Sequence, residues 1–330
     1  MAPKIQNISH THKDNPAPGH LDFIGDIHGY ANALENLLQK MGYIQASNGW
    51  AHPTSKAVFV GDFINRGPNN RRTLEIIRQM VDNGNAYAIL GNHEINAICY
   101  FTKRNSGKPI RMPGPANRKQ LDRVKREYLL QPHLFDETIK WLRHLPLFIN
   151  FGSVRVVHAY WSDNHVESLQ RVMDNKKLKR NFLKEVMQGG SDISKAFMQI
   201  TKGVEFSFPP NLIVRDNDSF RRINYRVKWW EVPHGKTFES ISLETKFTLP
   251  DIAVPDELLI PFEVYPHTAP PVFVGHYCMN GHNPIPVHNV CCVDSCVAGG
   301  GKLAAYRWSG EKMLNIQKMV FADHFSNEDD

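Results

Sequence analysis

The chain has 330 residues, of which 42% are hydrophobic and 22% charged, and these proportions exclude the disordered and fibrous classes. No run of about 18 apolar residues is present and the N-terminus has no apolar signal stretch, so we expect no membrane partner and a cytoplasmic location. The formal charge of +6 mildly favours anionic partners. We expect residues 1–20 to be a flexible arm and 21–330 one domain, with a helical and β insertion at about 161–260.

Five short apolar runs, each ending at polar residues, are predicted to be buried strands. They span 21–24, 57–60, 86–90, 154–157 and 271–274. Apolar residues at helical spacing predict helices at 31–41 and 69–84, between the first three runs. This alternation implies parallel strands, whose carboxyl ends share one edge of a sheet. The polar residues after the runs therefore mark a ligand site at that edge.

Farther along the chain, a basic loop followed by helices is expected over 102–145. Within the insertion, we expect helices from about 166 to 200 and β-structure around 222–232 and 240–249. Nine Lys or Arg lie between Lys103 and Arg126. We interpret them as a solvated face, with steering of phosphorylated substrates as the alternative. Nucleic acid is an unlikely partner, because no aromatic-rich or helix-turn-helix signature accompanies the charge.

The five cysteines form no CxxC pair, and their number is odd. Without a secretory signal, this pattern predicts reduced thiols. Three of the cysteines crowd into 291–296, where a zinc or redox role is the less favoured alternative to simple burial.

The polar residues after the first two runs are typical of a metal site. Asp26 and His28 are two residues apart, so both side chains can point to the same side. A carboxylate with an imidazole suits Mn²⁺, Fe or Zn²⁺ better than Mg²⁺ or Ca²⁺. Asp62 offers two oxygens, which could bridge two ions about 3.5–4 Å apart. Asn92, His158 and His276 would complete the shell of the second ion.

Five motifs in one order resemble a known family. GDIHG (25–29), GDFINRG (61–67), GNHE (91–94), His158 and GH (275–276) resemble the phosphoprotein-phosphatase branch of the calcineurin-like metallophosphoesterases. That branch includes bacterial serine/threonine or tyrosine protein phosphatases and diadenosine-tetraphosphatase-like enzymes. The resemblance covers nearly the whole chain, with 161–260 least clear. It implies an α/β fold, a four-layer sandwich of two mixed β-sheets flanked by helices.

The resemblance also implies a role for each residue in a phosphatase with two divalent metal ions. We expect these ions to be Mn²⁺, with Fe or Zn²⁺ as alternatives. Asp26, His28 and Asp62 would hold the first ion. The second ion would be held by Asp62 together with Asn92, His158 and His276. A metal-bridging hydroxide would attack the phosphorus directly, without a covalent phosphoenzyme. The substrate-binding residues would be Arg66, Asn92 and His93, of which Arg66 neutralises a phosphate oxygen and His93 protonates the leaving oxygen.

Three departures from the family pattern stand out. The second acid of GDxxDRG is Asn65 here, whose carbonyl could accept the His93 N–H without adding a negative charge. We expect a lower pKa for His93 and weaker help with poor leaving groups. After His158, the usual glycines are replaced by Ala159-Tyr160-Trp161, which would either narrow the rim of the site or simply pack.

The third departure is the C-terminal stretch 291–308, which resembles the ending of bacterial diadenosine-tetraphosphate hydrolases at Asp294 and 299–302. The alternative is a shared strand and glycine turn without substrate meaning. The further phosphate-binding arginine of the family has only Arg221, Arg222 and Arg226 as candidates.

The favoured function is a phosphatase acting on phosphomonoesters, either phosphoproteins or small phosphoesters. Tyr160, Trp161 and Tyr277 at the rim would leave phosphotyrosine open. The alternatives are a bis(5'-nucleosyl)-tetraphosphate hydrolase and, because of Asn65, a catalytically weak phosphate-binding module.

Overall fold

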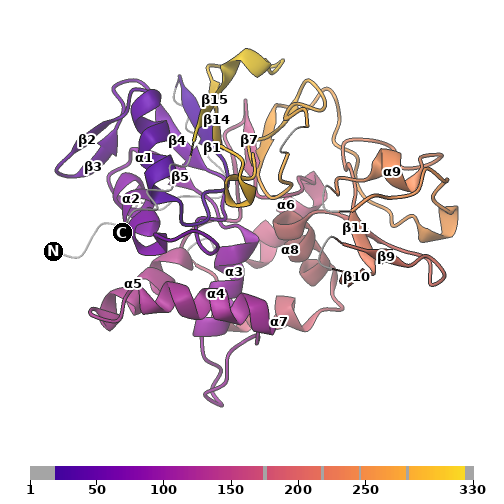
Figure 1. The fold of residues 1–330 in the computed structure, drawn as a ribbon, viewed down its shortest axis with the longest axis horizontal. Coiled ribbons are helices and arrows are strands. Elements are labelled where there is room, and N and C mark those ends of the chain that lie inside the picture. Colours follow the sequence, from indigo (N-terminus) through magenta and orange to yellow (C-terminus); the bar gives the residue numbers. More distant parts are fainter. Residues whose placement is uncertain (1–18, 174–176, 217–218, 245–246, 280–281, 324–330) are drawn as a thin grey trace.

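The computed structural model describes residues 19–323 except 174–176, 217–218, 245–246 and 280–281 (Figure 1). Nearly all of the expected N-terminal arm and the acidic C-terminal end lie outside the described residues. None of the helices in the described part is long and apolar enough to cross a membrane.

The first sheet contains five strands in the order β15-β14-β1-β4-β5. Its strands are β1 (Leu21–Ile24), β4 (Lys56–Phe59), β5 (Ala86–Ala88), β14 (Leu303–Trp308) and β15 (Met319–Ala322). The strands β1, β4 and β5 run parallel to one another, as the alternation of apolar runs and helices predicts. The strand β14 is antiparallel to both of its neighbours, β1 and β15. The sheet is therefore mixed.

A second sheet takes up the two remaining predicted strands. It has the order β13-β12-β7-β6, with β6 (Phe148–Asn150), β7 (Arg155–Val157), β12 (Val272–Val274) and β13 (Val290–Cys292). Here β7, β12 and β13 are parallel and β6 is antiparallel. Since β7 and β12 belong to this sheet, the five polar strand ends lie on two sheets instead of one edge.

The two sheets pack face to face through one apolar cluster. Phe23 of the first sheet stacks on Phe273 of the second, with ring centroids 3.8 Å apart. Val58 and Ile89 from the first side and Val156 from the second are fully buried in the same cluster. This packing fixes the strand ends of one sheet against those of the other, which confirms the expected sandwich.

The helices that follow the first strands match their sequence patterns. α1 (Ala31–Lys40) and α2 (Asn70–Asp82) bury the predicted apolar faces. α3 (Asn92–Phe101) begins within the third motif, and α4 (Pro115–Arg126) and α5 (Pro132–Leu142) follow the basic loop. A small hairpin, β2 (Ile44–Ala46) and β3 (Gly49–Ala51), sits at the margin opposite the insertion (Figure 1).

The segment 161–260 begins with the expected helices, α6 (Asp163–Val172), α7 (Arg180–Gln188) and α8 (Asp192–Lys202). Short strands follow: β8 (Glu205–Ser207), β9 (Val214–Arg215), β10 (Arg221–Arg222) and β11 (Asn224–Arg226).

The β-structure expected around 240–249 is wrong, because among the described residues of this range only Ser242 makes a β-bridge, to Val227. Ser240 and Ile241 belong to the helix α9 (Phe238–Ile241), and its capping box is made by Thr237 and Ser240. Hydrogen-bonding side chains at a helix start outweigh the alternation that favoured a strand. Short 3₁₀ turns occur at Asp256–Leu258, Val297–Gly299 and Ile316–Lys318.

Candidate metal centre

Polar residues after five strands converge where the two sheets meet. Asp26 follows β1, Asp62 follows β4, and Asn92 opens α3 after β5. His158 follows β7 and His276 follows β12 in the second sheet. Asp62 and His276 have left-handed backbone angles, with φ of 52° and 70°, which turn these side chains out of the strand direction. The structure thus brings all five side chains to one place.

The ligand set expected for the second ion is compact. The Oδ2 atom of Asp62 lies 3.4 Å from Nε2 of His158, and Oδ1 of Asn92 lies 3.2 Å from the same nitrogen. The Asn92 oxygen also lies 2.8 Å from Nδ1 of His276. Atoms of Asp62, His158 and His276 able to bind a metal all lie within 4.8 Å of one another.

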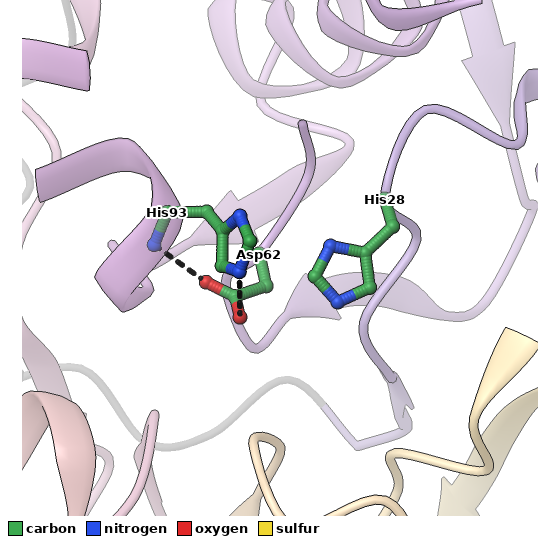
Figure 2. Close-up of side chains that lie close together, drawn as sticks. All are labelled: His28, Asp62 and His93. Atoms are coloured by element: carbon green, nitrogen blue, oxygen red, sulfur yellow. Dashed lines mark hydrogen bonds and ion pairs between the residues drawn. The ribbon is translucent and has the colours of Figure 1, made fainter. Parts of the chain in front are cut away.

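The side chains around the expected first ion are arranged differently. Figure 2 shows the imidazoles of His28 and His93 near the Asp62 carboxylate, and these three residues also offer metal-binding atoms within 4.8 Å of one another. Asp26 is outside this group, although it lines the same cavity. One of its oxygens, Oδ2, accepts the backbone N–H of His276 at 3.0 Å. The other, Oδ1, is buried without a hydrogen-bond partner among the described residues.

Two motif glycines are needed because side chains of the centre lie against them. A Cβ atom on Gly91 would stand 2.2 Å from Oδ1 of Asp62, and one on Gly275 would stand 2.0 Å from Oδ1 of Asp26. Both distances are far below van der Waals contact. Only glycine therefore lets these backbones approach the carboxylates.

Glu94 supports the loop that carries Asp62, a role that the sequence reasoning missed. Its carboxylate accepts backbone N–H bonds from Asp62 at 2.8 Å, Phe63 at 2.9 Å and Gly91 at 3.1 Å. Burial raises the pKa of Glu94 to about 7, and the charge of Asp62 raises it too, whereas two of these N–H bonds lower it. The sequence signal for this role is the position of Glu94 as the third residue of α3, from which a carboxylate can accept hydrogen bonds from the loop before the helix.

The carboxylates of the centre have opposite electrostatic environments. Burial raises the pKa of Asp26 well above its usual value, and the charges of Asp294 and Asp62 raise it further. Burial has the same effect on Asp62, but the charges of His158 and His93 outweigh it and hold the pKa of Asp62 well below its usual value. Asp62 is thus ionised at neutral pH, which is the form of a carboxylate that binds a cation.

The imidazoles are mostly held neutral. Burial is the main cause of the low pKa of His28 and His276, which lies well below the ordinary value for both. Burial also lowers the pKa of His158, but the Asp62 carboxylate raises it above the ordinary value. A cation binds the neutral imidazole. The low pKa values of His28 and His276 therefore favour metal binding.

A cavity of about 420 Å³ lies over these residues. Arg66 and Gln120 line it, and of the three arginine candidates only Arg226 does so. Arg222 instead pairs with Asp216, outside the cavity. Two guanidinium groups in one small cavity suit a phosphate group.

Asn65 contacts His93 through the amide nitrogen and not through the expected carbonyl. Its Nδ2 lies 2.7 Å from Nδ1 of His93, and its Oδ1 is buried without a partner in the described chain. An amide nitrogen only donates, so Nδ1 of His93 accepts and the ring proton sits on Nε2. The pKa of His93 is lowered, in the expected direction, with burial as the main cause.

The expected aromatic rim is wrong for Tyr160 and Trp161, which do not line the cavity, whereas Tyr277 does line it. All three side chains are at most 1% exposed. The Tyr160 hydroxyl donates to the Glu263 carbonyl and accepts its N–H, both at 2.9 Å. Trp161 donates to Asp163. Ordinary packing, the alternative, explains these bulky residues.

The C-terminal stretch contributes Asp294 and Gly299 to the cavity, whereas Lys302 pairs with Asp323 at the surface. The expectation that all thiols are reduced is wrong, because Cys278 and Cys296 form a disulfide. The two cysteines are 18 positions apart, and their pairing depends on the approach of two loops, which the spacing of cysteines in the sequence does not show.

The sandwich and the carboxylate–imidazole centre define a metal-dependent phosphoric ester hydrolase. Residues 19–230 match the calcineurin-like phosphoesterase family, and the chain belongs to this family. Its members use divalent metal ions.

Among curated proteins, the chain is 26% identical over 306 residues to a symmetrical bis(5'-nucleosyl)-tetraphosphatase of Janthinobacterium sp. (strain Marseille), covering 89% of this chain and 94% of that protein. It is 27% identical to a protein of the same name from Aromatoleum aromaticum, covering 89% and 95%. A protein serine/threonine phosphatase from Saccharomyces cerevisiae has a similar fold, with a TM-score of 0.51 at 15% identity over 97% of this chain and 84% of that one.

Proposed function

We propose that this chain is a hydrolase with two divalent metal ions, held as the family resemblance implies. The observation that carries the proposal is the convergence of Asp62, His158 and His276 on one point, with the Asn92 oxygen between the two imidazoles. The orphaned buried atoms Oδ1 of Asp26 and Nε2 of His276 fit metal ligands, because buried polar atoms rarely lack a partner. Mixed carboxylate and imidazole ligands favour Mn²⁺, with Fe and Zn²⁺ as alternatives.

The remaining residues complete a site for phosphoryl transfer to water. Bound divalent ions would make water more acidic and polarise phosphate oxygens. Arg66 and Arg226 are placed to neutralise a phosphate group in the cavity. The Nε2 atom of His93 lies 3.9 Å from Oδ2 of Asp62 (Figure 2). The proton on this nitrogen would be supplied to the leaving oxygen.

For the substrate, we favour a bis(5'-nucleosyl) tetraphosphate over the phosphomonoester that the sequence favoured. Both long alignments, which cover 89% of this chain, are to proteins named for that activity. The argument for phosphotyrosine is weaker, because Tyr160 and Trp161 do not line the cavity and Tyr277, which does, is only 1% exposed. A phosphomonoester, from a phosphoprotein or a small molecule, is the second candidate, and a weak phosphate-binding module is the third.

The test is hydrolysis by metal-stripped protein with Mn²⁺ returned, given diadenosine tetraphosphate and a phosphoserine peptide in separate and competing assays. We expect Mn²⁺-dependent turnover with a higher kcat/KM for the dinucleotide. The variant Asp62→Asn should abolish turnover, whereas Asp216→Asn, outside the cavity, should not. Preference for the peptide would reverse the substrate choice. Absence of any turnover with Mn²⁺ bound would leave the phosphate-binding module.

A further inference from the structure

The disulfide joins the two loops that border the metal centre from the second sheet. The first loop, 275–279, follows β12 and carries His276; the second, 293–299, follows β13 and carries Asp294. Cys278 lies in the first loop and Cys296 in the second, with their Cα atoms 4.7 Å apart. Both cysteines line the catalytic cavity.

The Asp294 carboxylate bridges the same two loops by hydrogen bonds. Its Oδ2 accepts the N–H of Cys278 at 2.8 Å and its Oδ1 accepts the N–H of Cys296 at 2.9 Å. The carbonyl of Asp294 also accepts the N–H of Met279 at 2.8 Å. Both cysteines have left-handed backbone angles, with φ of 52° and 61°, which are unfavourable for residues with a Cβ atom. The disulfide and Asp294 together hold both loops in this conformation.

Any displacement of Cys278 reaches the metal centre over a short stretch of backbone. Only Tyr277 separates Cys278 from His276 in the chain. The N–H of His276 bonds to Asp26 at 3.0 Å, and its Nδ1 meets the Asn92 oxygen at 2.8 Å. Supporting groups that orient a ligand typically change metal affinity or activity about 10–100-fold when they are lost.

We propose that Cys278 and Cys296 are a reversible redox modification site, whose disulfide positions His276 for metal binding. In the oxidised form the two loops are fastened and the imidazole is aligned with Asp62 and Asn92. In the reduced form the Asp294 hydrogen bonds still join the loops, but the covalent link between them is absent. The centre then binds the second ion more weakly.

Reduction of the Cys278–Cys296 disulfide proceeds by thiol–disulfide exchange with a dithiol. One thiolate of the dithiol attacks the Cys278 sulfur, which is the more exposed of the two, and forms a mixed disulfide while Cys296 leaves as a thiolate and takes up a proton. The second thiol of the reagent then closes the reagent's own disulfide and releases Cys278 as a thiol. Two electrons pass from the dithiol to the protein, and a low-molecular-weight disulfide reverses the sequence.

The test compares three proteins across a series of dithiol/disulfide buffers. These are the wild type, the double variant Cys278→Ala/Cys296→Ala, and Cys99→Ala, whose buried thiol lies outside the cavity. In each buffer, thiols are counted by alkylation and mass spectrometry, and Mn²⁺ affinity is measured by calorimetry. The inference rests on the proposed metal site, and neither readout requires a substrate. Mn²⁺ binding by the oxidised wild type tests that site separately from the effect of reduction.

We expect the wild type and Cys99→Ala to gain two reactive thiols on reduction and to lose Mn²⁺ affinity by about 10–100-fold, with recovery on reoxidation. The double variant should resemble the reduced wild type in every buffer. Thermal unfolding shows whether the double variant is folded, so that weak metal binding is not confused with unfolding. The reduced wild type tests the loss of the disulfide without any substitution. Unchanged or tighter Mn²⁺ binding by the reduced wild type would overturn the proposal. Failure of Cys278 and Cys296 to form a disulfide in any of the buffers would also overturn it.

Discussion

Replacing Asn65 with Asp restores a carboxylate beside His93 and should raise the pKa of that imidazole. The Asn65 amide nitrogen lies 2.7 Å from Nδ1 of His93, so the new charge would lie about 4 Å from the centre of the ring charge. Two opposite charges at about 4 Å attract by about 4 kcal/mol at an effective dielectric constant of about 20. Burying the new carboxylate offsets part of this gain, and a rise of about 1–3 pKa units is the expected net effect.

The direction of the pH effect follows from the role of His93 as a proton donor. Burial lowers the pKa of His93 in the natural chain, so the protonated ring is lost as the pH rises through this low value. A higher pKa moves the alkaline limb of kcat/KM upward by the same number of pH units. On the alkaline side, each unit increases the protonated fraction up to about tenfold.

The assay compares two substrates with different leaving groups, a nitrophenyl ester and an alkyl ester of phosphate, over a range of pH. Asn65→Asp should accelerate the alkyl ester and leave the nitrophenyl ester nearly unchanged, because only the alkoxide needs a proton from His93. Asn65→Ala is the matched control, since it removes the amide contact without adding a charge. Identical pH profiles for Asn65→Asp and the natural protein would refute the role assigned to His93.

Two further substitutions test the packing and the charge of the cavity. Gly275→Ala should weaken Mn²⁺ binding at least about tenfold in calorimetry, because its Cβ would stand 2.0 Å from the Asp26 carboxylate, whereas Gly114→Ala, with nothing within 4 Å, should not. Arg226→Gln should lower kcat/KM about 10²–10³-fold in initial-rate assays, because Arg226 lines the cavity. Arg222→Gln, outside the cavity, should leave kcat/KM unchanged. Equal effects of the two substitutions would contradict phosphate binding by Arg226.

Local sequence patterns predicted the strands and helices near the centre well. The apolar run before Asp26 and the helical spacing over 31–41 each reflect burial on one side, which is a local property. The patterns could not assign strands to sheets. β7 and β12 have the same short apolar character as β1, and only long-range pairing places them in a second sheet.

Side-chain direction was the second limit. The aromatic residues after His158 could have faced the cavity or the interior, and the choice depends on partners far away in the chain. The Tyr160 hydroxyl finds both hydrogen bonds at Glu263, more than a hundred residues later. The orientation of the Asn65 amide and the approach of Cys278 to Cys296 depend in the same way on contacts that no local pattern records.

The centre belongs to neither sheet alone. The side-chain oxygens of Asp62 and Asn92 come from the first sheet, and the imidazoles of His158 and His276 come from the second. The contacts within this group cross between the sheets, from Asn92 to His276 at 2.8 Å, from Asn92 to His158 at 3.2 Å and from Asp62 to His158 at 3.4 Å. The geometry of this group therefore depends on how the sheets pack, and the buried cluster between them, which includes the Phe23–Phe273 stack, contributes to that packing. The apolar core between the sheets thus acts as the support for a polar site at its edge.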